Sequence, residues 1–201
     1  MLAGFPYIKM PAFTGGAVAD VAALLLLNGR IKTYEHVKAV AETNVFIAER
    51  YGLDAGVCEL CGYLHDVSAV VAPSDMLAYA AVNGWRVYEA EKRYPFLIHQ
   101  RISEIIAERD FSITDARLLS AVGCHTTLRA EPSAYDMAVF VADKLAWDQE
   151  GTPPFYDAVN DALDISLEAA SIAYMDYIVE HKMILHPHDW FNDGVRWLRG
   201  I

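Results

Sequence analysis

The chain has 201 residues, a formal net charge of −11 and a composition that is 54% hydrophobic and 21% charged. This length fits one domain, and the hydrophobic share supplies a core, which excludes a disordered chain. The negative charge argues against a nucleic-acid partner, which needs a basic patch, and against binding to an anionic membrane surface.

The first element is an apolar run, Ala17–Leu27, which Asp20 interrupts. The run is too short for a transmembrane helix, which needs about 20 residues, and it lacks the flanks of a signal peptide. We therefore expect a packing helix that Asn28-Gly29 ends. Three cysteines, an odd number, indicate reduced thiols and a cytoplasmic protein. They are Cys58, Cys61 and Cys124, and the first two have the spacing of a buried helix face.

The remaining segments also have a helical hydrophobic period, and no alternating strand pattern appears. Gly52 is placed to end a helix, whereas Asp54, Thr114 and Ser133 are placed as N-caps. The predicted helices after the first are Lys32–Tyr51, Asp54–Leu64, Ser74–Asn83, Pro95–Arg109, Asp115–Cys124, Ser133–Leu145, Tyr156–His181 and Asp189–Arg199. This pattern predicts one all-α domain over residues 1–201, a bundle of eight to ten helices. Its core spans about 20–148, and C-terminal helices at about 152–200 pack on it after a Gly- and Pro-rich loop.

Histidine and aspartate residues recur at the ends or in the interior of different predicted helices. Asp143 follows the apolar run Val139–Ala142. An unpaired carboxylate in such surroundings costs several kcal/mol in desolvation. Each residue alone has an ordinary explanation, such as a hydrogen-bonded core histidine. Together they predict a metal site, because helical bundles build such sites from facing helices. The six residues are His36, His65, Asp66, His99, His125 and Asp143.

These residues and their surroundings resemble the HD-domain phosphohydrolase superfamily, and within it the YqeK-type branch. The resemblance runs from about residue 20 to residue 198. The segments that carry it include Tyr34–Thr43, Gly62–Asp66, His125–Thr127, Phe140–Lys144 and Ile184–Pro187. It implies that His36, His65, Asp66 and Asp143 hold one metal ion, and that Asp66 bridges to a second ion held by His99 and His125.

The cofactors implied are two divalent transition-metal ions, described as iron in the family. Mixed imidazole and carboxylate ligands also suit Mn, Co, Ni or Zn. The resemblance further implies a symmetrical bis(5′-nucleosyl)-tetraphosphatase, a two-metal phosphoric-anhydride hydrolase that cleaves diadenosine tetraphosphate into two ADP. A metal-bridged hydroxide would attack phosphorus, with Asp66, His99 and His125 as the catalytic residues. With two ions and two carboxylates the site carries about +2, which attracts polyphosphate to an acidic protein.

Two other functions remain open on this scaffold. One is a 5′-nucleotidase or another phosphomonoesterase, and the other is a non-catalytic, nucleotide-binding regulatory protein. A homodimer is implied by the resemblance alone. The chain also departs from the family pattern, which has Lys at position 69 and Gly at positions 100 and 128. Here those positions hold Ala69, Gln100 and Leu128, and Ala146–Gln149 replaces an acidic-Pro-Gly-Arg stretch.

Two residues are candidates for contacts with the substrate, and a neighbouring lysine is expected to have another role. Arg129 is a candidate phosphate clamp, because a guanidinium binds two phosphate oxygens at once, although an exposed surface position is the alternative. Thr126 is a candidate nucleotide contact. Lys144 is one helix position after Asp143 and is expected to point about 100° away from it, toward solvent or a salt bridge.

Overall fold

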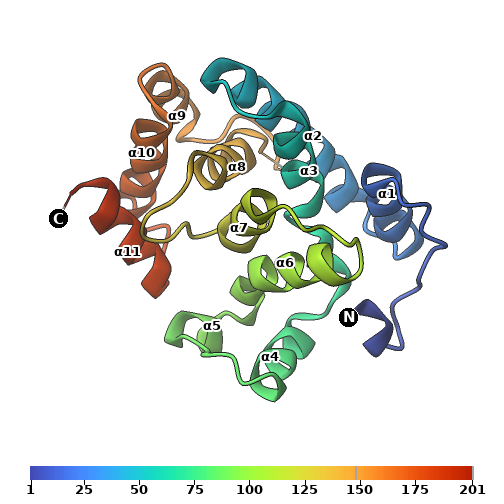
Figure 1. Ribbon diagram of the computed structural model, residues 1–201. Coiled ribbons are helices and arrows are strands. Elements are labelled where there is room, and N and C mark those ends of the chain that lie inside the picture. The colour runs from blue at the N-terminus through green and yellow to red at the C-terminus, as the bar shows by residue number, and fades with distance from the viewer. Residues whose placement is uncertain (148, 201) are drawn as a thin grey trace.

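The computed structural model describes residues 1–147 and 149–200, so Asp148 of the replaced stretch and the terminal Ile201 lie outside the described residues. The described residues form helices, turns and coil without a strand, which confirms the all-α bundle (Figure 1). They contain eleven α-helices, one more than the upper expectation, and three short 3-10 helices. The α-helices are α1 (Ala17–Leu27), α2 (Ile31–Tyr51), α3 (Ala55–Leu64), α4 (Pro73–Val82), α5 (Glu89–Arg93), α6 (His99–Arg109), α7 (Ala116–Cys124), α8 (Ala134–Leu145), α9 (Tyr156–Leu163), α10 (Leu167–Glu180) and α11 (Asp189–Leu198). The 3-10 helices are η1 (Leu2–Gly4), η2 (Val67–Val70) and η3 (Pro95–Ile98).

Most helix ends follow the local signals in the sequence. Gly52 ends α2 in the left-handed region, with φ 66°, and the Asp54 carboxylate accepts from the first backbone N–H groups of α3. Ser133 and Asp136 form a capping box at α8. The predicted Thr114 cap is wrong, because the Asp115 carboxylate accepts from the Arg117 N–H and caps α7.

Two differences account for the extra helices. The segment predicted as one helix over Tyr156–His181 is α9 and α10. It breaks at residues 164–166, where the Ser166 hydroxyl accepts from the Ala169 N–H and starts a new helix. Helix α5 has five residues, too few to show a hydrophobic period. It forms because the Glu91 carboxylate accepts from the Tyr88 N–H at its start.

The two helices that carry the first predicted ligands pack at very close range. Gly62 of α3 lies against the α2 backbone, and a Cβ atom at this position would be 2.3 Å from the Ala41 Cα. Only glycine allows this approach without a shift of one helix. The close packing of α2 against α3 therefore depends on glycine at position 62.

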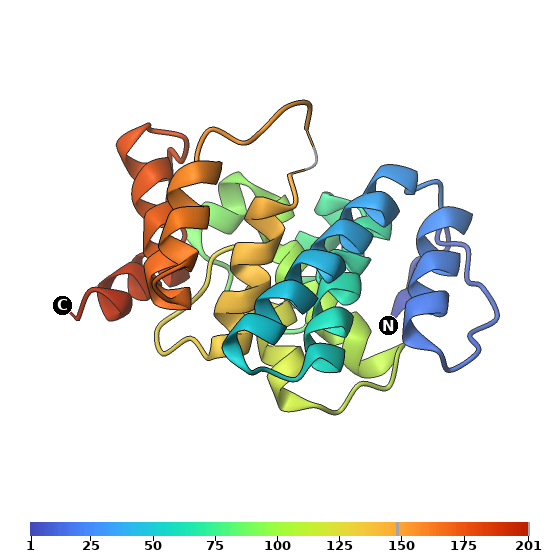
Figure 2. The same ribbon diagram turned by 90° about the horizontal axis from the view of Figure 1, so that it is seen from above.

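Helix α7 lies in the middle of the bundle and contacts α3, α6 and α8. Helix α8 contacts α2 on one side and α10 on the other, and residues 137–142 of α8 are all buried. Helices α9, α10 and α11 gather at the end of the molecule opposite α1 (Figure 2). Among the described residues, no single helix is long and apolar enough to cross a membrane. Within the described part of the chain, only the bent pair Ala55–Val70 and Pro73–Val82 reaches that length and composition together.

Candidate metal centre

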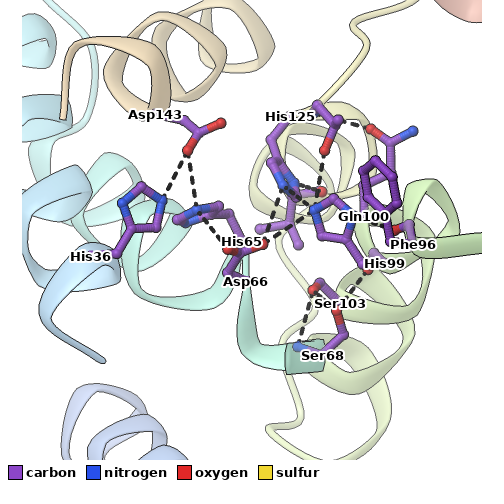
Figure 3. A network of polar contacts seen from close by, with 12 residues as sticks. His36, His65, Asp66, Ser68, Phe96, His99, Gln100, Ser103, His125 and Asp143 are labelled. Atoms are coloured by element: carbon purple, nitrogen blue, oxygen red, sulfur yellow. Dashed lines mark hydrogen bonds and ion pairs between the residues drawn. The ribbon is translucent and has the colours of Figure 1, made fainter. Parts of the chain in front are cut away.

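The fold brings all six predicted ligands into one cluster (Figure 3). Each helix around the centre contributes one or two of them. The contributions are His36 from α2, His65 and Asp66 from the end of α3, His99 from the start of α6, His125 from the end of α7 and Asp143 from α8.

The cluster divides into two groups that share Asp66. Potential ligand atoms of His36, His65 and Asp66 lie within 4.8 Å of one another, and so do those of Asp66, His99 and His125. Asp143 joins the first group, because its Oδ1 lies 3.0 Å from His36 Nε2 and 3.6 Å from His65 Nε2. Asp66 Oδ1 lies 3.2 Å from His99 Nε2 and 3.6 Å from His125 Nε2. One carboxylate thus stands between two sets of imidazoles.

Three of the histidines are oriented in the same way. His65 and His125 directly follow α3 and α7, and His99 directly follows the 3-10 helix η3. The Nδ1 atom of each lies within hydrogen-bond distance of the carbonyl three residues earlier. A carbonyl can only accept, so Nδ1 carries the proton and the lone pair of Nε2 faces the centre. The pairs are His65 with Gly62 O at 2.7 Å, His99 with Phe96 O at 2.6 Å, and His125 with Val122 O at 2.8 Å.

This donor set fits divalent transition-metal ions. Nε2 of His65 is buried and has no hydrogen-bond partner among the described residues. Nε2 of His99 lies 2.9 Å from Nε2 of His125, although the Nδ1 hydrogen bonds make both atoms acceptors. Two lone pairs at this distance repel unless a cation lies between or beside them. Imidazole and carboxylate ligands suit Fe, Mn, Co, Ni and Zn.

The environment of the cluster keeps both carboxylates and one imidazole deprotonated. Burial opposes charge on Asp66 and Asp143, yet their neighbours hold the pKa of each carboxyl well below its usual range. His65 and His125 act on Asp66, and Lys144 and His36 act on Asp143. Burial and the neighbouring histidines lower the pKa of His125 to about 4. Deprotonated carboxylates and a neutral imidazole are the forms that bind a metal ion.

The turn after α7 carries the candidate nucleotide contact beside the second group. Thr126 Oγ1 lies 3.1 Å from His99 Nε2. Gln100 is buried and holds this turn, because its Oε1 accepts from the Thr126 N–H and its Nε2 donates to the Thr127 hydroxyl. Leu128 has φ 53°, a conformation that favours glycine. Gln100 and Leu128, which replace the glycines of the family pattern, therefore help to form the turn next to the candidate centre.

The structure does not bring Arg129 to the six ligands. Its guanidinium donates to the Ser120 hydroxyl at 2.8 Å and lies 5.8 Å from the centre of the Trp190 ring. Its role as a phosphate clamp remains a prediction.

Lys144 is the residue that sequence reasoning placed least well. Of the two expected roles, the salt bridge is confirmed, but the expected direction away from Asp143 is wrong, because the ammonium group pairs with that carboxylate and the side chain is only 11% exposed. The only signal in the sequence was its position next to a ligand. Lys144 lines a cavity of about 240 Å³ together with His36, Asp66 and Asp143.

Aromatic residues that had no signal in the sequence complete the surroundings. Trp147, Phe155 and Tyr174 line the cavity that contains Lys144. A second cavity, of about 390 Å³, is mostly apolar, and Tyr174 and Thr126 also line it. The cavity that contains the candidate ligands and this apolar cavity therefore share the Tyr174 side chain.

Comparison with known proteins gives a consistent result. A model of the HD domain family matches residues 33–148. A protein of Lactococcus lactis subsp. cremoris, described as an uncharacterized protein in the pepC 5′ region, is 33% identical over 147 residues, 73% of this chain and 72% of its own length. The symmetrical bis(5′-nucleosyl)-tetraphosphatase of Staphylococcus aureus (strain NCTC 8325 / PS 47) is 28% identical over 158 residues, 77% of this chain and 76% of its own length.

Among solved structures, a predicted HD superfamily hydrolase involved in NAD metabolism from Clostridium acetobutylicum has the same fold. The TM-score is 0.79 at 22% identity, over 94% of this chain and 99% of that one. The family match covers more than half of the chain and includes all six candidate ligands. The chain therefore belongs to the HD domain family, a family of metal-dependent hydrolases.

Proposed function

We propose that this protein is a two-metal phosphohydrolase that cleaves a dinucleoside polyphosphate, diadenosine tetraphosphate, into two ADP molecules. The observation that carries the proposal is the pair of ligand groups joined at Asp66. His36, His65, Asp66 and Asp143 would hold one ion, and His99 and His125 with Asp66 would hold the other. Divalent ions at such a site acidify a water molecule and offset negative charge on phosphoryl oxygens.

The residues of the chain position these groups before a substrate arrives. The three Nδ1 hydrogen bonds keep the imidazoles aimed at the centre, so little reorganisation is needed when the ligands engage. Gln100 holds the backbone of Thr126 beside His99, where the hydroxyl can contact a phosphate oxygen. The leaving group is a phosphate oxygen, so it needs little protonation.

The choice of substrate rests on the named relative and on the shape of the surroundings. The Staphylococcus aureus relative is named a symmetrical bis(5′-nucleosyl)-tetraphosphatase. In this chain the cavity that contains His36, Asp66 and Asp143 has aromatic walls, and it shares Tyr174 with a second cavity that is also lined by aromatic rings. Aromatic rings favour stacking with bases, which supports a substrate with nucleosides attached to its phosphates.

The test is a product analysis on protein purified without a chelator. Elemental analysis should find two transition-metal ions per chain, with iron expected. Diadenosine tetraphosphate should give ADP as the sole product. Free phosphate from nucleoside monophosphates would instead indicate a phosphomonoesterase, and two ions without turnover of any nucleotide would indicate a binding protein. Removal of the ions should also weaken nucleotide binding, because the net charge of −11 then repels the phosphates.

The cytoplasmic location and the homodimer belong to the same proposal. All three cysteines are buried free thiols, which agrees with a reducing compartment. The dimer has support only from the resemblance of the sequence. Light scattering on the purified protein measures it directly.

A further inference from the structure

We infer that Lys144 binds a phosphate group of the substrate from within the cavity of the metal centre. This inference rests on the proposed function, because it names the residue that receives the phosphates at that site. Lys144 has the right position, the right charge and an unused hydrogen-bond donor.

The position of Lys144 comes from its surroundings on α8 and α10. Its Nζ pairs with Asp143 and lies 3.4 Å from the carbonyl of His125. The Phe140 and Tyr174 ring centres lie 5.0 Å and 5.7 Å from Nζ. These contacts turn the four-carbon side chain back toward the centre. Nζ therefore lies beside the Asp143 carboxylate and the main chain of His125.

The ammonium group of Lys144 pairs with the adjacent Asp143 carboxylate. A lysine ammonium has three N–H donors. The Asp143 carboxylate and the His125 carbonyl engage two of them, so a third donor remains for a ligand in the cavity that Lys144 lines with His36 and Asp66.

The charge of the site is more favourable with Lys144 included. Two divalent ions with Asp66 and Asp143 give about +2, and Lys144 raises the total to about +3. Such local charge matters in a chain whose net charge is −11. Arg129 does not supply this charge at the cluster, because its guanidinium contacts Ser120 and Trp190.

The experiment compares Lys144→Met, Lys144→Arg and Lys92→Met as metal-loaded proteins. Lys92 is more than half exposed on α5 and pairs with Glu89, so Lys92→Met removes the same charge away from the centre. The ligand is methylenediphosphonate, a diphosphate that cannot be hydrolysed at its bridge. Its affinity is measured by calorimetry, and the metal content of each protein by elemental analysis.

We expect Lys144→Met to keep both ions and to bind methylenediphosphonate about 10- to 100-fold more weakly, as for the loss of a charge-assisted hydrogen bond. Lys144→Arg should recover most of the affinity, and Lys92→Met should bind like the wild type. Turnover should show the loss mainly in KM.

Two results would overturn the inference. Unchanged affinity in a fully loaded Lys144→Met protein would show that the ammonium does not touch phosphate. A loss of metal ions that Lys144→Arg does not restore would show that Lys144 serves only to place Asp143. Hydrolysis of diadenosine tetraphosphate by the wild type tests the proposed function separately, since methylenediphosphonate binding needs no turnover.

Discussion

The two halves of the metal centre are built differently. The half around His36, His65 and Asp143 has a second carboxylate and a lysine, and it opens on the smaller cavity. The half around His99 and His125 adds no carboxylate of its own and lies next to the turn that carries Thr126. The first half concentrates charge, whereas the turn beside the second half lines the larger, mostly apolar cavity.

Under the proposed function, the two halves bind different parts of one substrate. Phosphate groups are best received where Lys144 adds positive charge, and a nucleoside is best received where the walls are apolar. Asp66 is the only ligand that belongs to both ligand groups of the described residues. Substitutions can test this comparison in three steps. The first replaces the shared ligand, the second replaces one histidine in each half, and the third alters the helix packing or capping behind each half.

Replacement of the shared ligand has the largest expected effect. Asp66→Ala should remove both ions and lower turnover by more than about 100-fold, because even partners outside the ligand shell cost 10- to 100-fold. Asp157→Ala, an exposed acid on α9, is the matched control and should keep both ions. Full metal content and turnover in Asp66→Ala would refute the shared-ligand assignment.

Removal of one histidine from each half should separate the two ions. His36→Gln and His125→Gln should each retain one ion per chain and lose at least about 10-fold in turnover. Elemental analysis and initial rates on the same preparations give both quantities. If either variant lost both ions, the two halves would form one cooperative site rather than two.

The packing behind the first half should be sensitive to a single methyl group. Gly62→Ala places a Cβ against the Ala41 backbone and should lower the free energy of unfolding by about 1–3 kcal/mol. It should also weaken metal binding in the half that contains His36 and His65. Gly56→Ala is the control in the same helix, because the nearest atom is 3.4 Å away, and it should be neutral or stabilising by up to about 1 kcal/mol. Equal stabilities of the two variants in urea would contradict the close approach of α2 and α3.

The helix behind the second half should show the smallest effect, and it should depend on pH. Asp115→Ala removes the cap of α7 and should cost about 1 kcal/mol at pH 7. Hydrogen bonds from Arg117 lower the pKa of Asp115 to about 2.

A folded-state pKa below the ordinary value means that this stabilisation is complete above about pH 4 and is lost as the pH falls toward 2. Urea unfolding at several pH values should therefore show the difference between wild type and Asp115→Ala shrinking below pH 4. Thr114→Ala is the control, with an expected change below about 0.5 kcal/mol. A loss of stability above about 0.5 kcal/mol in Thr114→Ala would instead support Thr114 as the cap of α7, as the sequence predicted.

The clustering of the six candidate ligands could be predicted from the sequence because it depends largely on local features. Gly52 and Asp54 mark the boundary between α2 and α3, which places His65 at the end of α3, and Ser133 marks the start of the helix that carries Asp143. The hydrophobic period then turns these ends toward the core. The break between α9 and α10 was missed because Ser166 acts as a cap inside an otherwise helical pattern.

The surroundings of the ligands could not be read in this way. Lys144 follows Asp143 on the helix, and helical spacing alone turns it away. Its side chain bends back because of Phe140 on its own helix and Tyr174 on α10, thirty residues later in the chain. Arg129 is held by Ser120 and Trp190. Such placements depend on packing between distant helices, which no local pattern records.

Main-chain carbonyls at helix ends orient three histidines, and this affects which substitutions the candidate centre tolerates. The acceptors at Phe96 and Val122 belong to the main chain, so a new side chain at either position leaves the hydrogen bond in place. The orientation of His99 and His125 is thus set by the backbone at the helix end. His36 lies inside α2 and contacts Asp143 instead. A designer who moves this centre to another bundle could carry over two helix ends without their neighbours, but His36 and Asp143 only as a pair.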